Sequence, residues 1–492
     1  MSSLHNVQDE KDLQDSVHLE ERDDNESALT PDQVDFKNAE ARVLRKLDLF
    51  ITPVMLMLQL ISYLDRGNIG FAATQGMSKD IGLKGNQLNI AVSIFYLFYI
   101  LAEFPTTLFV KRVQFHIAIP VLAACWGIIC LCTGFIQNFA GLVVCRLMLG
   151  IFEGCLFPSM TLLLLNWYKR EEVATRISFL YIGSALSGAF GGLIAFGILY
   201  MNGVAGYEGW RWLYIIEGLL TIVFSVGCYC AIPSSYNTAY FLTTEDKAIM
   251  KRRAEQMEAY SGGTGKYTRK DMKNAAVDMK TWLHGFIQIF CSTMIYGFGT
   301  FLPVIIHSGF HYSTKQAQYL VIPVNIVGAI CYGTGAILAD KYKARFISII
   351  VMAPLGVIGY AILLSPQKPA IWYFATYLVS ASCYIITGTN IAWHGMNTAP
   401  DGKRAAAMGI HLGLANIGGI IAGQIYKTTS APRYLLGHGW TLASIGTAFI
   451  GWWVLYFIYK RREAEKDRMI AEHTVVPAEE WTDRAPDFRY QF

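Results

Sequence analysis

The chain has 492 residues, of which 53% are hydrophobic and only 16% are charged. Soluble globular proteins carry about 25% charged residues, so this composition indicates a membrane protein and excludes an ordinary soluble domain. The formal net charge of +4 is small, and where the charges lie matters more than their sum. Ten cysteines lie in apolar runs, without a CxxC pair or zinc-like spacing with histidine, so we expect no metal, cofactor or disulfide framework.

The first 45 residues are hydrophilic and rich in Asp and Glu. No cleavable signal peptide is visible in them, and we expect residues 1–45 to form a disordered cytosolic tail. No nucleic-acid partner is expected.

Apolar runs of about 20 residues follow, each long enough to span a hydrocarbon core of about 30 Å. They predict an all-α membrane protein with twelve transmembrane helices, split six and six by a hydrophilic segment. The expected domains are a first half at 46–232, a central cytoplasmic loop at 233–280, a second half at 281–460 and a cytosolic tail at 461–492. The expected helices are 48–73, 88–110, 116–136, 141–165, 174–199, 211–232, 281–304, 316–339, 344–364, 369–395, 404–426 and 440–459.

Basic residues orient the predicted helices. Lys and Arg gather before the first helix, in every second loop, in the central segment and after the twelfth helix, whereas the alternate loops contain few. Cytoplasmic loops carry the excess of Lys and Arg, so both termini and the central loop are expected in the cytoplasm.

Glycines recur in the fifth, eighth and eleventh predicted helices, with GxxxG spacings at 188/192 and 419/423. Helices three apart are equivalent in a fold built from three-helix repeats. Small residues there predict close approach between helices of opposite halves. Generic membrane-helix packing is the alternative interpretation. No GxxxxGK[ST] sequence is present, which argues against an ATP-driven pump.

Four ionisable residues interrupt two of the apolar runs. Arg146 and Glu153 lie seven residues apart in the fourth predicted helix and therefore share one face. Asp65 and Arg66 interrupt the first helix. A charge at bilayer depth costs at least a few kcal/mol unless it faces a partner or a water-filled cavity. Helix rise places Asp65, Arg66 and Arg146 in the outer half of the membrane and Glu153 nearer its midplane. This pattern predicts a polar site inside the membrane.

These residue types suit a proton-coupled anion site. An arginine is always charged and binds a carboxylate through two parallel N–H bonds. Moving that arginine from one carboxylate to another changes their proton affinities, which proton coupling requires. A static ion-pair network that fixes the first and fourth helices is the alternative. Among uncharged candidates, Tyr63, Tyr99 and Asn416 could hydrogen-bond a substrate, and Glu103 could line a cavity or cap a kinked helix.

The sequence resembles the anion:cation symporter family of the major facilitator superfamily. The resemblance covers residues 40–465 and is carried by Tyr63-Leu-Asp-Arg-Gly-Asn-Ile-Gly70 and by the stretch from Arg146 to Pro158. Two further stretches resemble its fungal branch, which includes allantoate, nicotinate, pantothenate and biotin permeases. They are Gly209-Trp-Arg-Trp-Leu-Tyr-Ile-Ile-Glu-Gly218 and Phe241-Leu-Thr-Thr-Glu-Asp-Lys247.

The resemblance implies a role for each matching residue. Arg66 would bind the substrate carboxylate, with Tyr63, Tyr99 and Asn416 lining the cavity. Asp65 and Glu153 would carry protons, and Arg146 would switch between them. The superfamily's cytoplasmic gate motif is degenerate after the second helix. After the eighth helix it survives as Ala336-Ile-Leu-Ala-Asp340-Lys-Tyr-Lys-Ala-Arg345, with Asp340 and Arg345 as its charged residues.

The expected function is proton-coupled uptake of a small organic carboxylate by alternating access, in the plasma membrane of a fungus. The protein is expected to be a monomer and to use the proton gradient in place of a cofactor. Two alternatives remain, which are a drug efflux antiporter and a nutrient receptor that hardly transports. An enzyme is the least expected class, since no nucleophile–base or metal set is legible.

Overall fold

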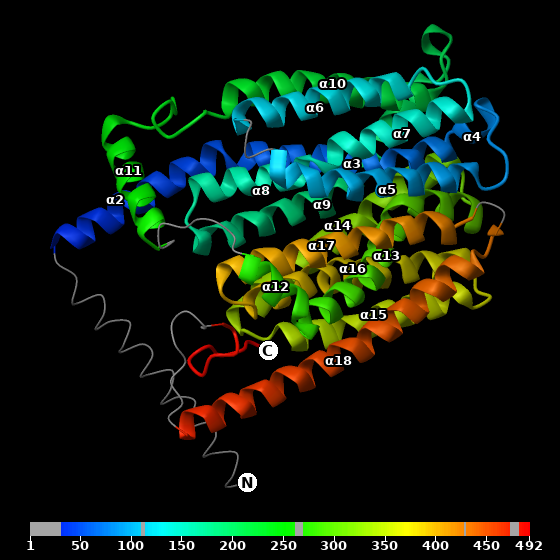
Figure 1. Ribbon diagram of the computed structural model, residues 1–492. Helices are drawn as coiled ribbons and strands as arrows, with labels where there is room; N and C mark the ends of the chain where they lie inside the picture. The colour runs from blue at the N-terminus through cyan, green and yellow to red at the C-terminus, as the bar shows by residue number, and fades with distance from the viewer. Residues whose placement is uncertain (1–30, 110–113, 261–268, 428–429, 473–481) are drawn as a thin grey trace. The chain divides into compact units, whose positions relative to one another are not determined.

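The computed structural model describes residues 31–109, 114–260, 269–427, 430–472 and 482–492 (Figure 1). Within these ranges the chain forms helices and no β-strand. The first 30 residues of the predicted N-terminal tail lie outside the described part. The helices are α2 (Pro31–Phe50), α3 (Thr52–Thr74), α4 (Met77–Asp80), α5 (Gln87–Phe109), α6 (Phe115–Thr133), α7 (Phe139–Gly154), α8 (Leu156–Trp167), α9 (Arg170–Ile198), η2 (Leu199–Met201), η3 (Val204–Gly206), α10 (Gly209–Ala231), α11 (Thr244–Tyr260), α12 (Arg269–Val277), α13 (Met279–Val304), η4 (Ile305–Gly309), α14 (Thr314–Lys341), α15 (Arg345–Leu364), α16 (Pro369–Met396), α17 (Asp401–Ile425) and α18 (Leu435–Ala471).

The prediction of twelve membrane helices is confirmed. Eleven helical stretches of the described chain are long and apolar enough to cross a membrane, and the shorter apolar stretch Gln87–Glu103 of α5 supplies the second span. The first span is α3, the fourth is the pair α7 and α8, and the remaining spans are α6, α9, α10 and α13 to α18.

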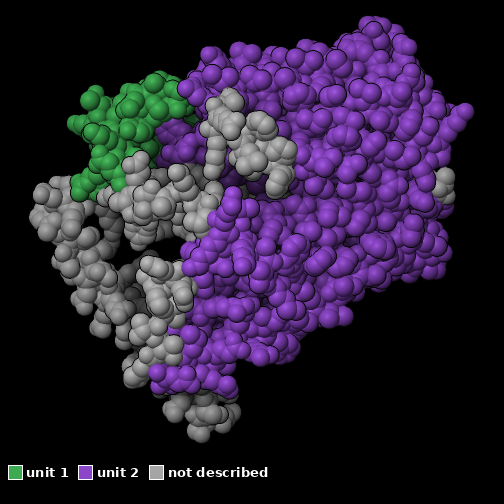
Figure 2. Space-filling view, in the orientation of Figure 1, with its two compact units in different colours: residues 1–53, 233–263 green, residues 54–232, 264–492 purple. Residues whose placement is uncertain are grey.

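The chain divides into two compact units, residues 1–53 with 233–263 and residues 54–232 with 264–492 (Figure 2). The membrane helices of both predicted halves fall in the second unit, apart from the first two residues of α3. The predicted central loop is helical in part, because it contains α11 and α12.

In the smaller unit, α2 packs on α11. Glu40 accepts a hydrogen bond from Arg253 at 2.6 Å, and Lys46 pairs with the buried Asp246. Residues 31–45, which were expected in a disordered tail, are therefore helical with partners on α11. The same unit gives a structural role to the stretch Phe241 to Lys247, which was quoted for the family resemblance. Thr243 and Asp246 each bond the other's backbone N–H, which is a capping box that begins α11.

Helix contacts in the larger unit repeat after six spans. The second, third, fourth and sixth spans pack as the pairs α5–α7, α6–α7 and α6–α10. The eighth, ninth, tenth and twelfth spans pack as the equivalent pairs α14–α16, α15–α16 and α15–α18. The same pairing recurs in both sets of spans, as expected for two pseudo-symmetric six-helix halves.

The glycine-rich helices join the two halves, as their spacing predicted. The fifth span α9 packs on α14, and the eleventh span α17 packs on α5. A Cβ atom added at Gly188 would lie 2.6 Å from Asn325, and one added at Gly423 would lie 2.4 Å from Ser93 Oγ. The side chain of Asn89 then donates to the Gly423 carbonyl at 2.7 Å. Small residues therefore permit the close approach between halves.

Glycine also fixes the position of the charged fourth span. A Cβ atom at Gly150 would lie 2.4 Å from the Phe95 carbonyl oxygen, and one at Gly154 would lie 2.5 Å from that of Tyr99. The helix α7 consequently lies directly against α5. Its last turn carries Glu153, after which the span breaks at Cys155 and continues as α8.

Candidate functional site

A cavity in the larger unit is lined by residues from both halves. All four residues predicted to bind substrate (Tyr63, Arg66, Tyr99 and Asn416) belong to its lining. The sequence also left open whether Glu103 faces a cavity, and it does. The lining residues of the first half are Gln59, Tyr63, Arg66, Tyr99, Glu103, Phe157 and Ser184, and those of the second half are Gln288, Ser292, Ile295, Tyr296, Tyr332, Tyr384, Thr387, Gly388, Ile391, Leu412, Ala415 and Asn416.

The guanidinium of Arg66 is the cation of this cavity. Its Cζ atom lies 4.5 Å from the ring centroid of Tyr63 and 4.7 Å from that of Tyr99. Its Nε donates to Glu153 Oε1, which also accepts the hydroxyl proton of Ser62. Arg66 is therefore held by two aromatic faces and one carboxylate, while part of its surface remains available to the cavity.

Asp65 faces the other way. Its Oδ2 accepts the indole N–H of Trp126, and its Oδ1 accepts bonds from Asn68 at 3.2 Å and Cys130 at 3.3 Å. Asn68 also donates to Glu217 of α10. Consecutive helix residues point about 100° apart, so Asp65 and Arg66 have different surroundings. The carboxylate of Asp65 lies against α6 and α10, whereas the guanidinium of Arg66 lines the cavity.

Arg146 does not pair as the sequence suggested. Its Nη2 donates to the hydroxyl of Tyr214 at 2.8 Å, and its Nε has no hydrogen-bond partner among the described residues. No ion pair joins Arg146 to Asp65 or Glu153 in the described structure, and Glu153 is paired with Arg66 instead. Asp65, Arg66 and Arg146, which helix rise places at a similar depth, therefore have separate partners in this structure. Helix spacing places residues on a face but does not give the rotation of the neighbouring helices.

Asn416 connects the two halves across the cavity. Its Nδ2 donates to Glu103 Oε2 at 2.9 Å, and its Oδ1 accepts the hydroxyl of Tyr296 at 3.0 Å. Tyr296 in turn lies 4.7 Å from Tyr96 between ring centroids. The α17 amide therefore binds one carboxylate of the first half and one tyrosine of the second.

The predicted gate motif covers the last turns of α14 and ends at the first residue of α15. The side chain of Asp340 lies outside the described residues. Arg345 is buried at the start of α15, where its Nη1 donates to Gln491 Oε1 at 2.8 Å.

Several site residues had only a weak signal in the sequence. Ser62 precedes Arg66 by one helical turn, which is a spacing that sequence analysis could have used. Trp126 and Tyr214, which hold Asp65 and Arg146, come from other helices and have no local signal. Arg211, by contrast, is structural: it pairs with Asp80 at 2.6 Å and donates to the carbonyl oxygens of Gly134 and Ile136.

The comparison with protein families agrees with this architecture. The model described as Major Facilitator Superfamily matches residues 55–423. The chain belongs to the Major Facilitator Superfamily. It is accordingly a multi-pass membrane transporter of the secondary type and not an enzyme.

Relatives within this superfamily are fungal transporters. An uncharacterized transporter of Schizosaccharomyces pombe is 39% identical over 461 residues, which are 93% of this chain and 91% of the relative. The high-affinity nicotinic acid transporter of Saccharomyces cerevisiae is 32% identical over 458 residues, which are 92% of this chain and 85% of the relative.

Solved structures of the superfamily share the fold at low identity. The D-xylose-proton symporter is 12% identical with a TM-score of 0.63, covering 82% of this chain and 97% of its own. A bacterial homolog of the human lysosomal transporter Spinster, in an inward-facing and occupied conformation, is 14% identical with a TM-score of 0.63, covering 84% and 96%.

Proposed function

We propose that this transporter takes up a small organic carboxylate together with protons, as a member of the anion:cation symporter branch of its superfamily. The observation that carries the proposal is Arg66, the one cation among the described residues that line the cavity, where Glu103 is the one carboxylate and the other lining residues carry hydroxyl, amide or apolar side chains. A planar guanidinium binds a carboxylate through two N–H bonds, so an anion is the ligand that this cavity suits.

The pair between Arg66 and Glu153 supplies a coupling mechanism. Both carboxylates, that of Glu153 and that of the substrate, need the same guanidinium. When the substrate binds Arg66, Glu153 loses its counter-charge while it remains buried, and it takes up a proton. Anion and proton therefore bind together and leave together.

Asp65 and Arg146 have supporting roles in this proposal. Asp65 is the second proton carrier, because it is buried among neutral donors and has a carboxylate neighbour, Glu217, across Asn68. Arg146 has an unused Nε inside the membrane, and a rotamer change could bring it to a carboxylate that has lost its proton. This keeps the predicted switching role, although the present structure has Arg146 on Tyr214.

The distribution of basic residues supports an orientation of the protein in the membrane. Basic loops favour a cytoplasmic location for both termini and the central segment. Asp340 and Arg345 would then belong to the cytoplasmic gate. The structure's contacts between halves at Gly70, Asn89 and Gly423 lie at the other end of the spans, which would face outward. We place the protein in a fungal plasma membrane as a monomer that uses a proton gradient and no cofactor.

The substrate class is a vitamin-like or nitrogen-source-like carboxylate such as nicotinate, pantothenate, biotin or allantoate. The relative named for nicotinic acid transport supports the class, while the neutral lining residues would choose among its members.

Uptake of radiolabelled carboxylates into vesicles with an inward-directed proton gradient tests the proposal. We expect accumulation of at least one of them, loss of uptake when its carboxylate is amidated, and loss in Arg66→Lys, because lysine lacks the two-point geometry. An Arg461→Lys variant is the matched control, since that side chain is exposed and pairs with Glu465 of its own helix. Normal uptake by Arg66→Lys would show that Arg66 is structural.

A further inference from the structure

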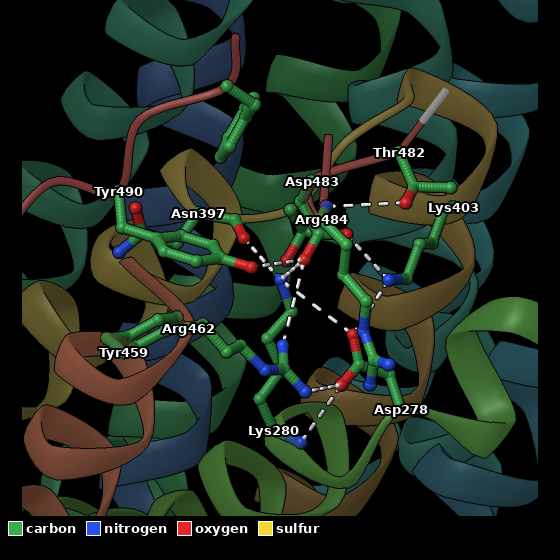
Figure 3. Close-up of polar contacts among 12 residues, drawn as sticks. Asp278, Lys280, Asn397, Lys403, Tyr459, Arg462, Thr482, Asp483, Arg484 and Tyr490 are labelled. Carbon is green, nitrogen blue, oxygen red and sulfur yellow. Dashed lines mark hydrogen bonds and ion pairs between the residues drawn. The ribbon is translucent and has the colours of Figure 1, made fainter. Parts of the chain in front are cut away.

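Within the larger unit, residues 482–492 fold back against the ends of α13, α15, α16, α17 and α18 (Figure 3). This segment, called the 482–492 segment below, was expected to be part of a plain cytosolic tail. Its contacts involve buried side chains from all five helices. It is therefore a docked peptide, and its docking site can be described residue by residue.

Buried charges form the centre of the docking site. Asp483 pairs with Lys280 and with Lys403, the latter at 2.6 Å, and lies 3.8 Å from Arg462. Asp278, the N-cap of α13, pairs with Lys403 at 2.7 Å and with Arg462 at 2.8 Å. We call Lys280, Lys403 and Arg462 the cationic socket. In Figure 3 the Asp483 carboxylate reaches down into this socket.

The far end of the segment makes backbone bonds of the kind a peptide ligand makes. The Gln491 N–H donates to Asn397 Oδ1 at 2.8 Å, and its carbonyl accepts from Asn397 Nδ2 and from the Trp393 indole, each at 2.8 Å. The Gln491 side chain accepts from Arg345 at 2.8 Å. Arg345, Trp393 and Asn397 therefore bind the backbone and the side-chain amide of Gln491.

Aromatic and ionic contacts with α18 complete the site. Tyr490 OH donates to Asp483 Oδ2 at 3.0 Å, its ring lies 4.9 Å from that of Tyr459, and the Lys466 ammonium lies 3.5 Å from its centroid. Arg489 pairs with Glu463 at 2.8 Å. These contacts hold the segment in one register on α18.

The charge balance shows that the site needs a carboxylate. With the segment bound, three cations face two carboxylates. Without it, the same three cations face Asp278 alone, so their mutual repulsion is less compensated. Burial alone raises the pKa of Asp483, but Lys280 and Lys403 outweigh it and hold that pKa below its ordinary value.

We propose that the 482–492 segment is a detachable latch, that the cationic socket is its binding site, and that docking holds the ends of α13, α16, α17 and α18 together as one block. The ligand class is an acidic and aromatic peptide, which inserts one carboxylate between three cations and pairs its backbone with Asn397. The latch acts within the second half and does not depend on which substrate is carried.

Trypsin cleavage of the full-length protein tests the latch. The segment contains Arg484 and Arg489, and cleavage after either releases short fragments that mass spectrometry can follow. A docked segment is cleaved only when it opens, so release from the wild-type protein should be at least about 100-fold slower than cleavage of a synthetic 482–492 peptide. Equal rates would show that the segment is not docked and would overturn the proposal.

The variant Asp483→Asn separates the socket from general packing. It removes the carboxylate and keeps the shape, and we expect release to become at least about tenfold faster than in the wild type. The matched control is Glu465→Gln, which removes an exposed carboxylate of α18 whose partner, Arg461, lies on the same helix, and which should leave release within about twofold.

If both variants release at the wild-type rate, the socket does not bind the latch. If Asp483→Asn fails to fold, the comparison of wild-type protein with free peptide still decides. Neither readout uses transport, so a failure of the proposed function leaves this test standing.

Discussion

The two halves of the transporter place their buried charges differently. In the first half, Asp65, Arg66, Arg146, Glu153 and Glu217 are buried within the spans α3, α7 and α10. In the second half, the buried polar residues within the spans include hydroxyls, amides and histidines. His284, Asn390, His394 and His411 contact one another there. The buried charges of the second half gather at the helix ends, where they include Arg345 and Lys466 as well as the cationic socket and its two carboxylates.

This difference indicates a division of labour. In the first half, two carboxylate oxygens, Glu153 Oε2 and Glu217 Oε1, have no hydrogen-bond partner among the described residues. The Nε atom of Arg146 also has none. Groups with spare bonding capacity can exchange partners or protons. In the socket, Arg462 Nη1 likewise lacks a hydrogen-bond partner among the described residues, but the carboxylate of Asp483 is bound by Lys280, Lys403 and Tyr490. The first half is therefore suited to change its charge state during transport, and the socket is suited to keep it.

The largest effect is expected from Glu153→Gln, which imitates a permanently protonated carboxyl in the first half. Glutamine keeps a hydrogen-bond acceptor near Arg66 and Ser62 but cannot release a proton. We expect accumulation of substrate driven by a pH gradient to fall at least about tenfold, while exchange of bound for free substrate continues. Flux assays on reconstituted vesicles measure both quantities.

The static alternative predicts a different result for the same variant. If the pair with Arg66 only fixes helices, removing one partner destabilises the fold by about 3–5 kcal/mol, so expression, binding and exchange decline together. Glu465→Gln is the control, because that carboxylate is exposed and forms an i,i+4 pair with Arg461, which contributes only about 0–1 kcal/mol. A well-folded Glu153→Gln protein that still accumulates substrate would remove Glu153 from the coupling mechanism.

A smaller effect is expected from a substitution at an uncharged contact between the two halves, that of Gly70 in α3 with α13. A Cβ atom at Gly70 would lie 1.9 Å from the backbone oxygen of Thr300, in α13. Backbone cannot move aside as a side chain can, so Gly70→Ala should force α3 and α13 apart and lower stability by about 1–3 kcal/mol. Melting temperature and initial uptake rate, measured side by side, report the loss of this contact.

The same helix offers a control with the opposite expected sign. Gly67 is one turn from Gly70, and a Cβ atom added there would meet no described atom within 4 Å. Alanine is the better helix former by roughly 0.5–1 kcal/mol, so Gly67→Ala should leave stability unchanged or raise it. If both variants behave alike, contact with α13 is not what requires glycine at position 70.

Hydropathy and motif spacing predicted one part of this arrangement and missed another. Twelve spans and the close glycine contacts could be read from the sequence, and the family resemblance implied the cavity position of Arg66, Tyr63, Tyr99 and Asn416. The partner of Glu153 could not, because seven-residue spacing pointed to Arg146 on its own helix. The partner actually found, Arg66, comes from another helix whose rotation depends on packing. A periodic pattern predicts which residues share one face of a helix, but it does not predict which helix packs against that face.

The 482–492 segment shows the same limit more strongly. Its sequence is short, and the alternation of Phe488, Tyr490 and Phe492 with polar residues extends over only five positions, so the sequence predicts no more than a plain tail there. Asp483 becomes a buried ligand only because Lys280, Lys403 and Arg462 come together from three helices. Each of those cations, seen alone at a helix end, is an ordinary positive-inside residue. Only the assembled fold shows that they share one carboxylate.

The smallest effect, and the sharpest contrast between the two charge clusters, is expected from pH. The pKa of Asp278 and that of Asp483 both lie below the ordinary value of 3.8, because Lys280 and Lys403 outweigh the burial that would raise them. A carboxyl whose docked pKa is lowered contributes its stabilisation fully above the ordinary pKa and loses it as pH falls through the docked pKa. The latch should therefore remain docked throughout the range in which a proton gradient drives transport. Hydrogen exchange in residues 482–492, normalised at each pH to the free peptide, should be constant from pH 7 to pH 5 and rise only below about pH 4. In Asp483→Asn the same segment should exchange at its faster rate already at neutral pH. Opening of the wild-type latch between pH 7 and pH 5 would mean that the socket titrates together with the transport site, and the division between a changing and a constant charge cluster would then be wrong.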